Sequence, residues 1–366
     1  MTLKTRMIIS FMMAVLFISA PVWAEESKIH FHGYGELHYN GQNGAVDKVD
    51  FHRMVWGLSY QYNDRISVHS EVDFEHAAQE MELEYAHVDF NISPLLNVRA
   101  GAMLMPVGHL NEFHEPPLFY SVERAKVQST VIPTTWQEAG IGLFGASDAG
   151  LKYRLYFVSG LNAKGFESGK GIREGRSKMS AGHSSVNDKT LYNSGDDFAV
   201  VARVEYAGIP GVNVGFSGYS GGADQGVDAN NGVDVTIVEG DLRYRWKGLD
   251  ITAVYAQVDI GDAQKLSAKK VGEKITGFYG EVGYDLLSYR GGKEKLVTFV
   301  RVEEVNTHAA VPTGVTADPK NDLTIKAFGL AFYPISDVAF KVDWQTEEDG
   351  TGADKEFVNA GVAYMF

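Results

Sequence analysis

Charged side chains recur at every second position along several stretches of the sequence. Glu239, Asp241, Arg243 and Arg245 are the densest example. In an extended strand, residues two apart point to the same face. Charges of both signs on one face of a sheet can line a water-filled interior and set the field that acts on a passing ion.

The same two-residue parity selects a larger set of inward-facing charges. Ten basic residues stand against thirteen acidic ones, which predicts a lumen that carries both signs, with Arg53, Arg99, Arg154, Arg203 and Arg243 as its principal basic wall. The basic candidates are Arg53, Arg65, Arg99, Lys152, Arg154, Arg203, Arg243, Arg245, Arg301 and Lys341. The acidic candidates are Glu36, Glu71, Asp73, Glu75, Asp89, Glu205, Glu239, Asp241, Asp259, Glu281, Asp285, Glu303 and Asp343.

The segment 106–137 is the candidate constriction of that lumen. It carries four prolines and the aromatic residues Phe113, Phe119, Tyr120 and Trp136, which need a place to pack. We expect it to fold into the interior and to narrow the pore with its charged groups. The alternative is an outward cap with no role in conduction. The candidate constriction residues are Glu112, His114, Glu115, Glu123, Arg124 and Lys126.

A second long segment, 160–195, is rich in glycine and serine and has a surplus of basic residues. Six Lys and Arg residues stand against three acidic ones, a net charge of 6 − 3 = +3. Such a loop can attract anionic solutes or bind lipopolysaccharide phosphates. A solvated surface loop is an equally good reading of the same composition.

Histidines gather near the N-terminus. Alternation puts His30 and His32 on one face, and imidazoles close to carboxylates can bind transition metals. Two residues of strand separate the rings by about 6–7 Å, which is loose for a tight site. We therefore predict no metal centre and keep His30, His32, His69 and His87 as weak candidates, with a polar pore-lining role favoured.

Composition excludes several classes of protein. The chain of 366 residues has no cysteine and a formal net charge of −14, which excludes thiolate chemistry and disfavours nucleic acid as a partner. It has no Gly-x-Ser-x-Gly elbow, no phosphate-binding P-loop and no dinucleotide fingerprint. No enzyme activity and no cofactor are predicted.

The first 24 residues have the pattern of a cleaved secretory signal peptide. Lys4 and Arg6 precede a short apolar run, and Val22 to Ala24 supplies small residues at the cleavage positions. Residues 25–366 are then the mature domain. No later stretch of 18 apolar residues exists, which excludes helical membrane spans.

Two-residue alternation continues along the mature chain, and the connections alternate between short and long. The pattern predicts an all-β fold: a sixteen-stranded antiparallel transmembrane β-barrel with short periplasmic turns, long external loops, apolar residues outside and polar residues inside. The expected strands are 28–39, 49–62, 65–75, 82–92, 95–105, 138–147, 151–159, 196–207, 212–220, 234–246, 250–259, 274–287, 294–305, 322–333, 337–346 and 356–366.

Residues 80–160 resemble the phosphate-selective porins of the O and P type. The matching segments are Tyr85 to Phe90, Arg99 to Gly101, Pro106 to Gly108, Pro117 to Tyr120 and Thr135 to Leu143. The resemblance implies a homotrimer of sixteen-stranded barrels and a third external loop folded into the lumen. The mixed charge of the predicted wall departs from the ladder of basic residues that marks the phosphate-specific members.

These features predict a porin in the outer membrane of a Gram-negative bacterium, in contact with lipid and lipopolysaccharide. Small hydrophilic solutes or ions would diffuse through it, with phosphate among the candidate anions. Two alternatives stay open. A non-conducting barrel would act as a surface anchor or adhesin, and a hydrolase would carry its catalytic residues at the rim.

Overall fold

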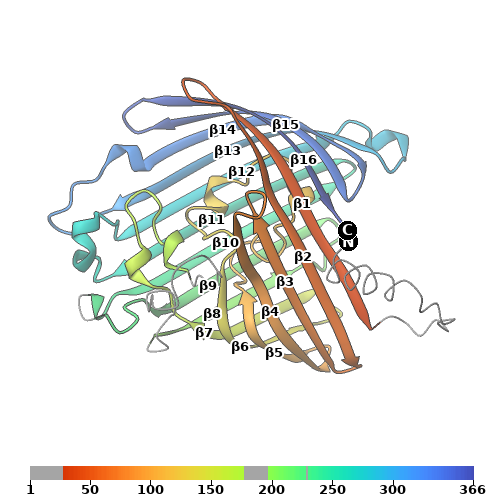
Figure 1. Cartoon of the computed structure of the whole chain (residues 1–366), viewed down its shortest axis with the longest axis horizontal. Coiled ribbons are helices and arrows are strands. Elements are labelled where there is room, and N and C mark those ends of the chain that lie inside the picture. The colour runs from red at the N-terminus through yellow and green to blue at the C-terminus, as the bar shows by residue number, and fades with distance from the viewer. Residues whose placement is uncertain (1–27, 177–196, 228–229) are drawn as a thin grey trace, which may run out of the picture.

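Sixteen antiparallel strands close into one barrel in the computed structural model, which describes residues 28–176, 197–227 and 230–366 (Figure 1). Each strand pairs with its neighbours in sequence, and β1 pairs with β16 to complete the ring. The strands are β1 (Ile29–Gln42), β2 (Lys48–Asn63), β3 (Ile66–Glu75), β4 (Glu80–Ser93), β5 (Leu96–Leu104), β6 (Gln137–Ala146), β7 (Leu151–Ser159), β8 (Phe198–Tyr206), β9 (Val212–Gly222), β10 (Asp234–Trp246), β11 (Leu249–Gly261), β12 (Lys274–Asp285), β13 (Lys295–Ala310), β14 (Asp322–Ile335), β15 (Val338–Asp349) and β16 (Asp354–Met365).

All sixteen predicted strands are present, and the fold prediction is confirmed. The largest boundary error lies in β13, which continues to Ala310 although residues 306–310 were expected to be loop. Their polar side chains suggested a loop, but the backbone still pairs with β12 as far as Lys274 opposite Ala310. The predicted signal peptide and residues 177–196 of the basic loop lie outside the described residues.

The longest connections lie at one end of the barrel, but three connections at that end, 43–47, 76–79 and 350–353, are as short as turns, which corrects the expectation of long loops there. Seven short connections lie at the end where β1 begins and β16 stops; we call this the terminus end and the opposite one the loop end. At the terminus end, the backbone of Phe366 exchanges two hydrogen bonds with Gly33, at 2.9 and 3.0 Å, and extends the β1–β16 ladder. The long connections include 105–136 and 160–197.

Alternate residues of every strand face outward, and on this face they are largely apolar. Phe216, Val238, Tyr255 and Phe278 on β9 to β12 are between 42% and 66% exposed. Closing the barrel leaves no strand edge unpaired, so the outer surface presents apolar side chains without free backbone groups.

The inner face is polar only in part, which corrects the expectation of a polar lumen throughout. Toward the loop end, β8 and β10 to β12 present aliphatic side chains inward, among them Val201, Ile237, Val258 and Ile275. They are buried because the connections 105–136 and 160–176 enter the barrel and cover them. The connecting residues in this hydrophobic cluster include Val107, Val127, Val131, Ile132, Trp136, Leu161, Phe166 and Ile172.

Short 3-10 helices occur in the connections. The longest is η7 (Ala263–Lys269), and η1 (Pro116–Leu118) and η2 (Lys126–Gln128) lie in the connection 105–136. Among the described residues, no helix has the length and apolar character needed to span a bilayer.

Candidate pore constriction

Residues 105–136, here called the lumen loop, leave the wall between β5 and β6 and fold into the barrel. The two ends of the loop are held together by Asn111. Its amide nitrogen donates to the carbonyl oxygens of Met105 and Trp136, at 2.8 and 2.9 Å, and its amide oxygen accepts from the N–H of Trp136 at 2.8 Å. Sequence reasoning missed this residue, because asparagine is common in loops.

The body of the loop lies against the wall on the β12 side. Gly277 on β12 makes this approach possible: a Cβ atom at that position would be 2.7 Å from the nearer methyl group of Val131. The absence of a side chain therefore leaves the space that the loop fills.

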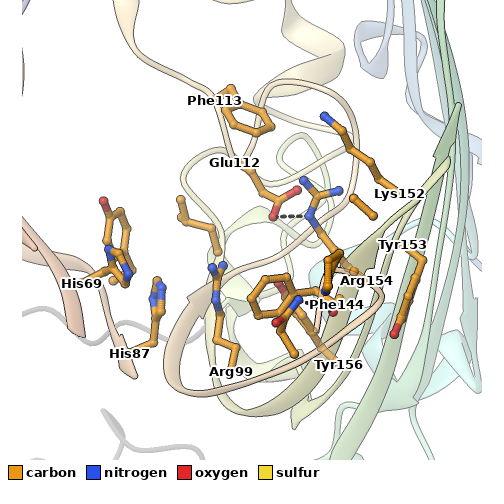
Figure 2. Close-up of a pocket in the computed structure, with 16 residues that line it drawn as sticks. His69, His87, Arg99, Glu112, Phe113, Phe144, Lys152, Tyr153, Arg154 and Tyr156 are labelled. Carbon is orange, nitrogen blue, oxygen red and sulfur yellow. Dashed lines mark hydrogen bonds and ion pairs between the residues drawn. The ribbon is translucent and has the colours of Figure 1, made fainter. Parts of the chain in front are cut away.

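An ion pair joins the loop to the wall at β7. The Arg154 guanidinium lies 2.9 Å from the Glu112 carboxylate (Figure 2). It also contacts Glu205 on β8. Burial raises the pKa of Glu112, although the positive charge of Arg154 acts in the opposite direction. Both residues were candidates from the sequence, one for the wall and one for the constriction, and the fold brings them together.

A second contact joins the loop to β4 and β1. The Glu84 carboxylate is 3.1 Å from Nε2 of His114 in the loop, and the hydroxyl of Tyr34 on β1 donates to Glu84 at 2.8 Å. Glu84 was not among the inward candidates, since alternation from Asp89 gives it outward parity. A β-bulge between β3 and β4 pairs Glu71 with Tyr85 and Val72 with Leu83, and this bulge turns Glu84 inward.

Strands β11, β13 and β15 hold the loop through further buried polar contacts. The Lys341 ammonium donates to the carbonyl oxygens of Pro116 and Ser121, at 2.6 and 2.9 Å. The Asp343 carboxylate accepts from the N–H of Val122 at 2.7 Å. Tyr120 donates to Asp250 at 2.7 Å, Arg301 to Ser121 at 2.5 Å, and Val127 N–H to Glu303 at 3.3 Å.

The remaining constriction candidates have different surroundings. Glu123 accepts from Asn40 at 3.0 Å and lies 3.1 Å from His38, both on β1. Arg124 stays within the loop, where it donates to Thr134 and to the His114 carbonyl. Glu115 is half-buried, and Lys126 lies 3.9 Å from Glu347 of β15. The loop thus contacts strands on every side and crosses the lumen.

Most of the predicted basic wall residues face carboxylates. Arg53 lies within 3.7 Å of Glu36, Asp73, Glu75 and Glu84. The other pairs are Arg99 with Asp89, Arg203 with Glu205, Glu239 and Asp241, Arg243 and Arg245 with Asp250, and Arg301 with Glu281 and Glu303. Three candidates differ: Arg65 lies in an exposed turn, Lys341 donates to backbone carbonyl oxygens of the loop, and Lys152 has no carboxylate within ion-pair distance among the described residues.

Three cavities border the loop. One of about 430 Å³ at the terminus end is lined by Arg99, Glu112, Lys152 and Arg154, with His69 and His87 opposite (Figure 2). Another of about 560 Å³, also at the terminus end, includes Tyr120 and Arg243. The third, about 420 Å³ at the loop end, is here called the vestibule. Its lining includes Glu36, His38, His52, Glu123, Lys126 and Glu347.

The four histidines considered as weak metal candidates are spread over the wall. His30 is exposed, and His32 lies 3.0 Å from Glu71. His69 and His87 stack at 5.3 Å, close to Asp89. A second cluster that sequence reasoning missed contains Asp50, His52 and His76.

Comparison with known proteins identifies the class of fold. No family model matches the chain. An uncharacterized protein of Aquifex aeolicus is 29% identical over 369 residues, which cover 95% of this chain and 82% of the relative.

Among solved structures, OmpF of Salmonella typhi in complex with daunomycin aligns with a TM-score of 0.62 at 12% identity, covering 94% of this chain and 99% of that one. An anion-selective porin of Comamonas acidovorans aligns with a TM-score of 0.59 at 10% identity, covering 93% and 100%. The chain therefore has the fold of the outer-membrane porin barrels.

Proposed function

We propose that this chain is an outer-membrane porin through which small hydrophilic solutes or ions diffuse passively. The apolar outer face and the closed ring of strands support insertion into lipid, since a bilayer tolerates neither unpaired backbone groups nor exposed charge. In the orientation usual for such barrels, the terminus end faces the periplasm and the loop end faces the outside of a Gram-negative cell. Cleavage of residues 1–24 belongs to the same proposal.

The observation that carries the proposal is the position of the lumen loop. It lies inside the barrel, bears Glu112, Glu123 and Arg124, and has solvent-accessible cavities on both sides. A loop placed in this way sets the width of the water path, and its charges set the field within it. The contacts with Arg154, Lys341 and Asp343 keep that width constant.

We further propose that the solutes include small anions such as phosphate. In the terminus-end cavity, Arg99 and Arg154 are each balanced by a carboxylate, whereas Lys152 adds a positive charge without one. This local excess supports the passage of anions. The homotrimer and the binding of lipopolysaccharide by the basic loop follow from the resemblance and the composition, and chemical cross-linking and lipopolysaccharide titration would test them.

The direct test is conductance in a planar bilayer under a salt gradient, with phosphate added in steps. A porin gives ohmic steps, and a trimer gives them in groups of three. A reversal potential on the anion side, together with block by phosphate, would support anion transport. Ohmic steps without phosphate block would indicate a general porin that does not select phosphate.

A non-conducting anchor is the second candidate, and one observation favours it. The lumen loop is bonded to strands around the ring, and none of the described residues lines both the vestibule and a terminus-end cavity. An anchor predicts no conductance in the intact protein and large steps after the loop is shortened. Conductance in the intact protein would exclude it.

A further inference from the structure

Three side chains from two segments of the chain meet at the loop end of the barrel. Asp50 and His52 lie on β2, and His76 lies in the connection between β3 and β4. His52 reaches this position through a β-bulge, because Glu36 pairs with Arg53 and Leu37 with Phe51, which leaves His52 as the extra residue. The cluster exists only because of that irregularity.

The atoms of the cluster converge as metal ligands do. Nδ1 of His52 lies 3.1 Å from Oδ2 of Asp50, and Nδ1 of His76 lies 2.8 Å from the same oxygen. Ligands of a tetrahedral zinc ion, each about 2.0–2.2 Å from the metal, are separated by about 3.3 Å. A shift of a few tenths of an ångström would therefore make room for an ion.

The backbone that presents His76 adopts a conformation that is uncommon for residues with side chains. His76, Ala77 and Ala78 all have positive φ angles, of 50°, 56° and 66°. Left-handed conformations at non-glycine residues carry a free-energy cost and concentrate at functional sites. Here the strained turn aims the imidazole of His76 at Asp50.

The cluster is also open to solvent and close to further ligand groups. The side chains of His52, Asp50 and His76 are 25%, 29% and 43% exposed, which leaves a coordination position for water. His52 lines the vestibule and stacks on His38 at 4.7 Å. Solutes at the loop end can therefore reach the site.

The charges around the cluster permit a cation. Arg53 is the nearest guanidinium, and its Nη2 lies 3.4 Å from Nε2 of His52. The same Nη2 of Arg53 donates a shorter hydrogen bond to Glu75, at 2.9 Å. The weaker contact can be given up when a metal on Nδ1 moves the imidazole proton to Nε2. Four carboxylates already surround Arg53, so little of its charge is left uncompensated.

The other cluster of this kind, His69, His87 and Asp89, is less suited to a metal. Arg99 donates to both oxygens of Asp89 at 2.8 Å, and both ring nitrogens of His69 contact serine hydroxyls at 2.9 Å. A metal there would have to displace a bidentate ion pair.

We propose that Asp50, His52 and His76 form a binding site for a divalent transition-metal ion of the zinc class at the loop end of the barrel. Two neutral imidazoles and one carboxylate would hold the ion, and each imidazole would lose the Nδ1 proton that it now donates to Asp50. The bound ion would join β2 to the β3–β4 connection. The proposal does not depend on conduction, since it concerns binding at the rim.

The experiment is titration of the full-length, untagged protein in detergent with Zn²⁺ by calorimetry and with Co²⁺ by visible absorption. We expect one site per chain. His76→Ala and His52→Ala should each weaken binding by about 100-fold or more, since even outer-shell changes cost 10–100-fold. His30→Ala is the matched control, because it removes an exposed histidine from β1 and should leave the affinity unchanged.

Three results would overturn the proposal. The first is stoichiometric binding that survives in a His52→Ala, His76→Ala double variant whose electrophoretic mobility still shifts on heating, as a folded barrel does. The second is loss of binding in His87→Ala, which would assign the metal to the His69 cluster. Absence of any binding at micromolar Zn²⁺ would contradict the proposal and leave the porin proposal intact, because conductance is measured separately.

Discussion

The guanidinium of Arg154 on β7 lies 2.9 Å from the carboxylate of Glu112 in the lumen loop (Figure 2). The pair lies on the cavity at the terminus end, beside Arg99 and Lys152. It is both a structural tie between loop and wall and part of the charge that a passing ion would meet. The two roles of the pair can be tested separately. The tie between loop and wall depends on the contact between the side chains, whereas the effect on a passing ion depends on their charge.

Removing the negative charge of this pair should favour anions. We predict that Glu112→Gln, which keeps the shape of the side chain, moves the reversal potential in a salt gradient toward the anion side. Arg154 would keep Glu205 as a partner, so the fold should persist. Glu348→Gln, an exposed carboxylate at the loop end of β15, is the control. An unchanged reversal potential in Glu112→Gln would show that this carboxylate lies off the ion path.

The same carboxylate should give the channel a pH dependence. Burial raises the pKa of Glu112 above the ordinary value of 4.5, so the group becomes neutral at a higher pH than an exposed glutamate does. As the pH falls through that pKa, anion selectivity should rise. The reversal potential measured from pH 8 to pH 4 checks this, and Glu112→Gln should lack the step.

Lys341 should hold the lumen loop in place. We predict that Lys341→Met leaves the carbonyls of Pro116 and Ser121 without their donor, at a cost of about 1–3 kcal/mol for each group. The loop should then be cleaved faster by trypsin at Lys126. Lys326→Met, which removes an exposed lysine from neighbouring β14, is the control. Equal cleavage rates in the two variants would contradict this role.

Asn111 should stabilise the barrel by closing the neck of the loop. Asn111→Leu removes three buried hydrogen bonds at similar side-chain volume, and we expect a loss of about 2–4 kcal/mol in the free energy of unfolding. Urea unfolding followed by tryptophan fluorescence measures the loss. Asn213→Leu provides the comparison, because the buried side-chain oxygen of Asn213 has no hydrogen-bond partner among the described residues. Similar urea midpoints for Asn111→Leu and Asn213→Leu would contradict the stabilising role of Asn111.

The inward direction of Glu84 can be tested by labelling, since the chain has no cysteine of its own. We predict that Met81→Cys, on an exposed position of β4, reacts with a maleimide, whereas Glu84→Cys is protected, because Glu84 is only 1% exposed. Mass spectrometry of the folded protein gives the extent of labelling. Rapid labelling at both positions would show that β4 lacks the bulge.

The alternation of residue types by itself determined the strand number, the closed antiparallel order and the facing of residues such as Arg53, Arg154 and Arg203. This is possible because side-chain direction in a regular strand depends only on position in the chain. It also identified the lumen loop, whose aromatic residues and prolines are unusual for a solvated connection.

Tertiary structure alone decided what these residues contact. The bulges at Glu84 and His52 reverse the local parity, and nothing in the alternation marks where an extra residue is inserted. The aliphatic side chains of the inner wall are buried because the lumen loop covers them, and alternation alone does not specify that cover. The ion pair between Arg154 and Glu112 joins residues that are 42 positions apart in the sequence (154 − 112). Such contacts depend on the path of the loop through the closed barrel, which no local spacing specifies.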